Sequence, residues 1–125
     1  TGSGPIDLSG YTLFGITFTF PAGSSIAAGE YIVVADTPST YSGHGYQVFD
    51  FSGGLSGSGE TVTIFDTYNQ AADSVTYGTV TPWPANTNAT DLSTSLLNPT
   101  LDNTVATNWT ASAQTGGTPG AVNFP

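Results

Sequence analysis

Residues 60–77 read ETVTIFDTYNQAADSVTY, and this stretch decides the fold. Apolar side chains alternate with polar ones on both sides of a polar segment at Thr67–Gln70: Val62 and Ile64 come before it, and Val75 and Tyr77 after it. A period of two is typical of a strand with one buried face. Two such arms around a short polar segment predict an antiparallel β-hairpin, with the turn at Thr67–Gln70.

The rest of the chain has the same β character. No window of about a dozen residues shows helical spacing of apolar residues without an interrupting Gly or Pro. Further short strands are predicted near Ile6 and Leu8, at Phe18 and Phe20, at Gln47–Phe51, at Leu92–Leu97 and at Asn108–Ser112. Five consecutive apolar residues at Tyr31–Ala35 predict a central strand that is covered on both faces. The sequence therefore predicts one all-β domain over residues 1–125, an antiparallel sandwich.

The charge composition excludes several functions. The 125 residues include nine Asp and Glu, one His, no Lys, no Arg and no Cys, for a formal net charge of −9. Binding to nucleic acid or to an anionic membrane surface requires cations, which the chain lacks. Schiff-base, thiolate and Cys-based metal chemistry are excluded as well. No apolar run reaches the roughly 18 residues of a membrane span, so membrane insertion is not expected.

Five motifs, in order along the chain, resemble one family. They are Pro5–Leu13, Phe18–Ala35 with its Phe-Thr-Phe-Pro-Ala-Gly start, Leu55–Ile64, Asp73–Gly78 with Trp83-Pro84, and Asn108-Trp109 with Thr115–Ala121. Together they resemble the lamin tail domain. The resemblance implies an immunoglobulin-like antiparallel β-sandwich, of the kind that bacteria and archaea often attach to secreted proteins.

The chain departs from the family's pattern in two places. Ser93-Thr94-Ser95 is polar where the family has an aliphatic residue and an acid, which places the strand there in doubt. The family also has an extended segment upstream of the Asp7-Leu8-Ser9-Gly10 motif, whereas this sequence begins close to that motif. The resemblance therefore implies that the first strand or two of the sandwich are absent.

No residue pattern indicates catalysis. His44 lies in a Gly-rich loop, and no nucleophile or acid can be assigned to it, so an exposed loop histidine is the simpler interpretation. Paired carboxylates for glycoside hydrolysis are not marked either. Asp66, Asp73 and Asp102 are interpreted as scattered solvated acids, with Ca²⁺ binding left open only where the acids of two subunits converge. No enzymatic activity and no cofactor are therefore expected.

Aromatic residues and sequons leave two further alternatives. Trp109 is interpreted as core, and Trp83, between two prolines, as the more exposed tryptophan, which would serve a carbohydrate-binding surface. Asn88 and Asn108 begin Asn-X-Thr glycosylation sequons, and Asn88, in a polar loop, is the better candidate.

The leading hypothesis is a structural protein that lies outside the cell or on its surface. A sandwich that lacks a strand exposes an unguarded edge, which a strand of a neighbouring subunit would complete, giving a homopolymer in a filament, sheath or surface layer. The candidate interface residues are Val122 and Phe124 in the C-terminal tail, and Ile6 and Leu8 near the N-terminus. The alternative is a carbohydrate- or surface-binding module of a larger secreted protein.

Overall fold

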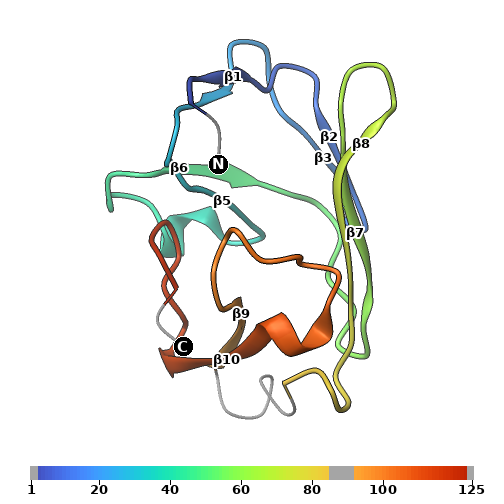
Figure 1. Cartoon of the computed structure of the whole chain (residues 1–125). Coiled ribbons are helices and arrows are strands. Elements are labelled where there is room, and N and C mark those ends of the chain that lie inside the picture. The colour runs from blue at the N-terminus through green and yellow to red at the C-terminus, as the bar shows by residue number, and fades with distance from the viewer. Residues whose placement is uncertain (1–2, 85–91, 124–125) are drawn as a thin grey trace.

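The computed structural model describes residues 3–84 and 92–123, and these form an all-β fold of the immunoglobulin-like type (Figure 1). The strands are β1 Ile6–Asp7, β2 Thr12–Phe14, β3 Phe18–Thr19, β4 Ser25–Ile26, β5 Ile32–Ala35, β6 Gln47–Asp50, β7 Glu60–Phe65, β8 Ala71–Tyr77, β9 Leu92–Leu96 and β10 Trp109–Thr115. Two single 3₁₀ turns, η1 at Pro38–Thr40 and η2 at Ala106–Asn108, are the only helical elements of the described residues.

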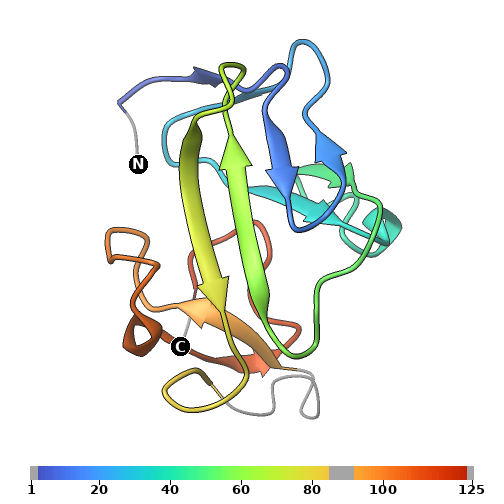
Figure 2. The same cartoon turned by 90° about the vertical axis from the view of Figure 1, so that its right-hand side faces the viewer.

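The largest sheet has four strands in the order β3-β2-β7-β8, which Figure 2 shows side by side. Its centre is the predicted hairpin, in which β7 pairs antiparallel with β8 and Val62 lies opposite Val75. The turn also lies where the sequence places it, because the Asp66 N–H donates to the Gln70 carbonyl and Asn69 has a positive φ of 59°. The hairpin prediction is confirmed.

Side-chain hydroxyls reinforce the outer face of this hairpin. The hydroxyl oxygens of Thr61 and Thr76 are 2.7 Å apart, and those of Thr63 and Ser74 are 2.8 Å apart, so each pair forms a hydrogen bond between the two strands. Such cross-strand pairs each contribute a few tenths of a kcal/mol, up to about 1. The two threonines that alternate with Val62 in the sequence therefore each bind a hydroxyl of β8, while Val62 lines the interior.

Facing the interior side of this sheet are two separate strand pairs (Figure 1). The pair β5-β6 is parallel, with Val33 opposite Val48, and the pair β9-β10 is antiparallel, with Leu96 opposite Trp109. β9 thus forms in spite of its polar sequence, because Ser93, Ser95 and Ser112 hydrogen-bond within the β9-β10 pair. In the view of Figure 1, β6, β5, β9 and β10 follow one another from top to bottom.

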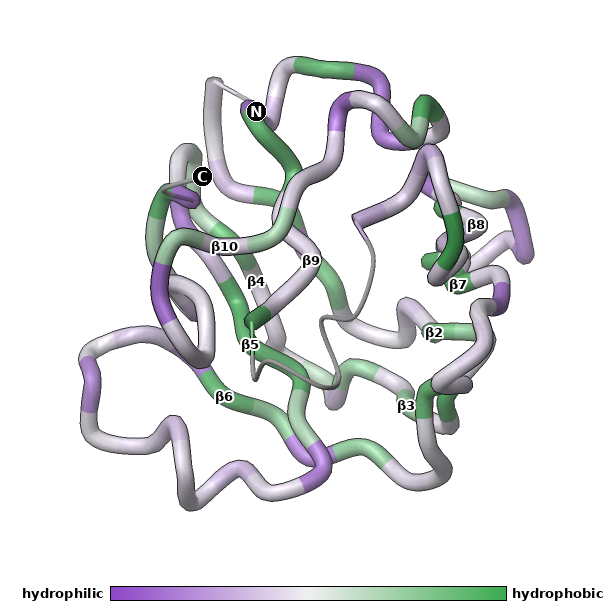
Figure 3. The backbone as a smooth tube through the Cα atoms, turned by 90° about the horizontal axis from the view of Figure 1, so that it is seen from below, coloured by the Kyte–Doolittle hydropathy of each residue, from purple (hydrophilic) through white to green (hydrophobic). Residues whose placement is uncertain are grey.

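The expectation of a central, fully covered strand at Tyr31–Ala35 is wrong. β5 pairs with β6 alone in the described part of the chain, and of its residues only Ala35 is buried, at 7% exposure. The remaining residues of β5 are half-buried. Figure 3 shows β5 and β6 as apolar stretches of the backbone tube. The apolar run therefore correctly predicts a strand. The edge of β5 that points away from β6 has no partner strand among the described residues.

Two aromatic clusters attach the two pairs to the large sheet. Phe49 of β6 contacts Phe18 and Phe20, with ring centroids 5.7 and 5.3 Å away. Below them, Trp109 of β10 lies 5.8 Å from Trp83, which follows the end of β8. Aromatic pairs at such distances add about 0.5–1.5 kcal/mol beyond the area they bury.

The interior between these contacts is thinly filled. Among the described residues only Leu8, Phe20 and Ala35 are buried apolar residues, and no side chain is fully enclosed. The accessible surface of 7462 Å² exceeds the roughly 6,200 Å² that is usual for a monomeric protein of this mass. The sandwich is therefore open.

We expect Gly59→Ala to destabilise the fold strongly. Gly59 has a φ of +104°, and a Cβ there would lie 2.5 Å from the backbone oxygen of Tyr77, where the hairpin begins. Gly23→Ala is the matched control, because Gly23 also has a positive φ (+86°) but open space around it. The free energy of unfolding of the control should fall by only about 1–2 kcal/mol, the cost of a left-handed backbone for a residue with a Cβ. Urea unfolding that gives equal losses for both variants would contradict the close approach at Gly59.

Candidate functional site

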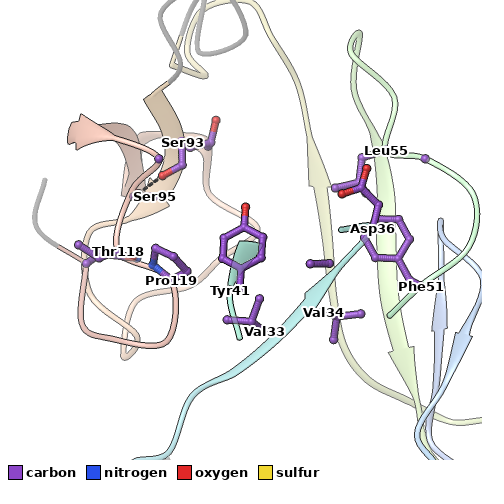
Figure 4. A pocket seen from close by; sticks show the side chains of 15 residues that line it. Val33, Val34, Asp36, Tyr41, Phe51, Leu55, Ser93, Ser95, Thr118 and Pro119 are labelled. Carbon is purple, nitrogen blue, oxygen red and sulfur yellow. Dashed lines mark hydrogen bonds between the residues drawn. The ribbon is translucent and has the colours of Figure 1, made fainter. Parts of the chain in front are cut away.

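The main concave feature is a hollow between β5 and β9. It comprises two adjoining cavities of about 560 Å³ each, which share Val34, Phe51, Leu55, Ser93 and Thr94 as common walls. We call this hollow the groove. Native cores contain few voids larger than a water molecule, so a space of this size is not ordinary packing. Figure 4 shows Val33 and Val34 of β5 on one side and Ser93 and Ser95 of β9 on the other.

The edge of β5 that borders the groove carries free backbone groups. The Phe51 N–H donates to the Ala35 carbonyl, which places the backbone groups of Ala35 on the β6 side. Because successive residues of a strand point their N–H and C=O groups to opposite edges, the groups of Val34 point to the groove side. In the part of the chain that the structure describes, no strand pairs with this edge.

The facing edge of β9 is partly occupied by a side chain. The Leu97 N–H donates to the Asn108 carbonyl on the β10 side, so the carbonyl of Leu96 points the other way, towards the groove. There the Asn123 side-chain amide donates to the Leu96 oxygen at 2.8 Å. Thr118 in turn donates its hydroxyl to the Asn123 side-chain oxygen at 3.2 Å. A side-chain amide thus takes the place of a neighbouring strand's N–H.

The lining is apolar towards the large sheet and polar at the rim. The inner cavity is lined by Leu13, Val62, Val75, Leu92 and Trp109. The outer cavity adds Tyr41 and one carboxylate, Asp36, together with Thr118 and Pro119 (Figure 4). An extended segment with alternating apolar side chains fits this pattern, because one face of such a segment would meet the apolar wall.

Tyr77 fixes the base of the inner cavity. Its hydroxyl donates to the Ser56 carbonyl at 2.6 Å and to a Glu60 carboxylate oxygen at 3.2 Å. Burial, followed by the Glu60 hydrogen bond, raises the pKa of Tyr77 above its ordinary value. Tyr77 is therefore a neutral, anchored wall of the groove.

The predicted interface residues are in different situations. Leu8 is buried at 7% exposure, and its N–H donates to the Ser24 carbonyl at 2.8 Å, so it belongs to the core of its own subunit. Ile6, in β1, is 48% exposed and pairs with Ile26. Val122 is 54% exposed and lies beside Asn123 at the groove. Phe124 and Asn88 lie outside the described residues.

Asn108 is engaged within its own chain. Its side-chain amide nitrogen, the atom that carries a glycan in a glycosylated sequon, donates to the Asp102 carbonyl at 2.8 Å. It also precedes Trp109, whose ring lines the groove. A glycan at this nitrogen would take one of its two hydrogens and leave one N–H to donate.

Trp83 is half-buried, so the expectation that it is the exposed tryptophan is wrong. Its ring contacts Trp109, and a Cβ at Gly78 would lie 3.0 Å from its Cδ1 atom, so the ring packs against that glycine. The flanking prolines exclude a central strand but say nothing of burial. Trp109 is half-buried too, with its indole N–H donated to the Asn103 carbonyl at 2.9 Å.

The titratable side chains are dispersed. His44 is exposed and stacks on Tyr46, with ring centroids 5.9 Å apart. No three His, Cys, Asp or Glu side chains group around a metal-sized space in residues 3–84 and 92–123. The acids serve turns instead: a hydrogen bond from the Ala27 N–H, then one from Gln47, lowers the pKa of Glu30. Bonds from Ser9 and Thr104 lower the pKa values of Asp7 and Asp102 in the same way.

Sequence reasoning did not identify Phe51, Leu55 or Asn123 as groove residues. Leu55 is 56% exposed, and an apolar residue in a Gly-Ser-rich loop is the one signal that points to it. Asn123 carries no local signal, because its role depends on a carbonyl 27 positions earlier in the chain.

Comparison with known proteins gives one finding on the family. Searches of curated proteins and of solved structures return no match. None of the described residues forms a helix that is long and apolar enough to cross a membrane. The family model for the lamin tail domain matches residues 1–79, a stretch that contains β1 to β8. Since this match covers more than half of the 125 residues and includes the whole four-stranded sheet, the chain belongs to the lamin tail domain family.

Proposed function

We propose that this protein is a non-enzymatic extracellular structural subunit, which assembles with copies of itself into a filament, sheath or surface layer by strand complementation. The observation that carries the proposal is the groove beside β5, an edge with which no strand of residues 3–84 and 92–123 pairs. Lamin tail domains are immunoglobulin-like domains of a non-enzymatic family, which agrees with the first part.

The arrangement of the edges supports completion by one strand. β5 belongs to one strand pair and β9 to the other. Residues of both strands line the outer cavity, so each pair turns one edge towards it. An extended segment between them would join β6-β5 and β9-β10 into one sheet opposite β3-β2-β7-β8. Strand addition gives affinity through main-chain hydrogen bonds and specificity through the alternate side chains.

The absence of cations favours such addition. Many proteins protect exposed strand edges with Lys or with inward-pointing charges. This chain has no Lys or Arg, and the single acid among the groove residues is Asp36 at the rim. The same composition offers no cleavage site to trypsin-like proteases, which supports a location outside the cell.

The alternative function is a carbohydrate- or surface-binding module, for which Trp83 was the expected exposed aromatic residue. Trp83 is half-buried against Trp109, which weakens this alternative. Co-sedimentation with insoluble polysaccharide separates the two functions. Binding of the monomer without polymer formation would favour the module.

We expect Val34→Asp to abolish polymers and to leave a folded, soluble subunit. In the free subunit the open groove leaves the new carboxylate hydrated, whereas an inserted strand would bury it at a cost of several kcal/mol. Negative-stain imaging and size-exclusion chromatography measure the polymer, and circular dichroism measures the fold.

Phe14→Asp is the matched control. It adds the same charge at a side chain that is 65% exposed on β2, whose neighbour Leu13 lines the groove, so that Phe14 points to the opposite face. The control should polymerise like the unaltered chain. Polymers of Val34→Asp, or a purely monomeric unaltered chain at high concentration, would refute assembly through the groove.

We expect assembly to strengthen with ionic strength. Each subunit carries −9 with no cation to offset it, and the Debye length falls from about 30 Å at 0.01 M salt to about 8 Å at 0.15 M. The critical concentration, measured by sedimentation, should therefore be lower at 0.15 M. Ca²⁺ compared with Na⁺ at equal ionic strength, with EDTA as the control, tests for bridging between the acids of two subunits. A critical concentration that stays the same with added salt, Ca²⁺ or EDTA would exclude both the screening of repulsion between subunits and bridging by Ca²⁺.

A further inference from the structure

We propose that the strand that fills the groove is the C-terminal segment, from Pro119 onwards, of a second copy of this chain. This inference rests on the proposed function, since it names the donor for the same groove. Three features of the described residues support it: the position of the segment, its exposed apolar side chain and its lack of charge.

The segment already lies at the groove of its own subunit. Thr118, Pro119 and Asn123 form part of the wall of the outer cavity. The Asn123 side-chain amide donates to the Leu96 carbonyl on β9, which is the acceptor that an inserted strand would use. Residues 119–123 are therefore positioned at the rim of the β9 edge, and none of them pairs with β5.

Val122 has no such place in its own subunit. It is an aliphatic residue that is 54% exposed, and the next residue, Asn123, lines the outer cavity. Asn123 turns its side chain to the Leu96 carbonyl of its own β9, whereas the neighbouring Val122 leaves about half of its surface exposed. In the groove of a second copy, Val122 would meet Val34, Phe51 and Leu55.

Charge separates this segment from the other candidate donor. The last acid of the sequence is Asp102, so residues 103–125 contain no Asp or Glu in a chain of net charge −9. The N-terminal segment places Asp7 between Ile6 and Leu8, and Leu8 is already buried at home. Insertion of the C-terminal segment therefore brings no Asp or Glu side chain into the groove, which avoids the desolvation cost of such a side chain.

The contact repeats head to tail. A segment that leaves its own β9 for the groove of the next copy exposes its own groove to a third copy. Such a heterologous contact produces rings where the rotation closes, and open filaments where it does not. In the neighbour the segment can make again the hydrogen bond to Leu96 that it gives up at home, and it adds contacts to β5 that it does not make at home.

The natural absence of cysteine allows a direct test by cross-linking. Val34→Cys and Val122→Cys are made as separate proteins, one of them labelled with ¹⁵N, and mixed under mild oxidation at polymer-forming salt. A disulfide forms only where two Cα atoms come within about 4.4–6.8 Å. We expect the mixed 34–122 dimer, identified by intact mass, to exceed by at least tenfold the mixed dimer that Phe14→Cys forms with Val122→Cys, a difference of about 1.4 kcal/mol.

A second acceptor variant guards against a folding defect at Val34. Leu55→Cys lies at the rim of the groove and is 56% exposed, so the substitution removes little packing. It should cross-link to Val122→Cys in the same way as Val34→Cys. Mixed dimers no more abundant than those with Phe14→Cys, for both acceptors, would overturn the proposal.

The readouts also separate this inference from the proposed function. Polymers in the microscope without the 34–122 or 55–122 disulfide would reject the C-terminal donor and leave assembly intact. A specific disulfide in a species no larger than a closed dimer would support the donor and reject the filament. Neither polymers nor specific disulfides would reject both.

Discussion

The contact of Phe49 with Phe18 and Phe20 is the interaction on which the shape of this molecule depends. It fixes β6, and through β6 also β5, above one end of the four-stranded sheet. At the other end, Trp109 and Trp83 fix β10 and β9. Because each strand pair has its own attachment, the sheet holds the two pairs in place without any direct ladder between them. The groove is what remains between these two attachments.

The parts of the fold that depend on neighbours in sequence were predictable. The alternation around Val62 and Val75 predicts the hairpin with its turn, since both partners lie within 18 residues. The short strands that begin at Phe18, Gln47 and Leu92 were predicted in the same way, from short runs of β-forming residues between Gly, Pro, Asn and Ser. The family resemblance supplied the immunoglobulin-like fold, which the match over residues 1–79 bears out.

The parts that depend on distant partners were not predictable. The apolar run at Tyr31–Ala35 shows that the strand is suited to burial, but whether a second strand covers it depends on what lies beside Val34 in space. Trp83 was misjudged because its prolines describe its backbone, while its burial depends on Trp109, 26 positions later. The groove is predictable in kind, as an open edge, but Leu55 and Asn123 as parts of it are not.

The hydrogen bond from Asn123 to Leu96 has a thermodynamic consequence for whatever strand enters the groove. The incoming backbone N–H replaces an amide that is already bonded to the same oxygen, so this site gains no additional hydrogen bond. New main-chain hydrogen bonds would then form mainly at the β5 edge, and the removal of apolar lining from water would add a negative heat-capacity change. Assembly through the groove should therefore show a negative heat-capacity change, whatever the sign of its enthalpy at room temperature.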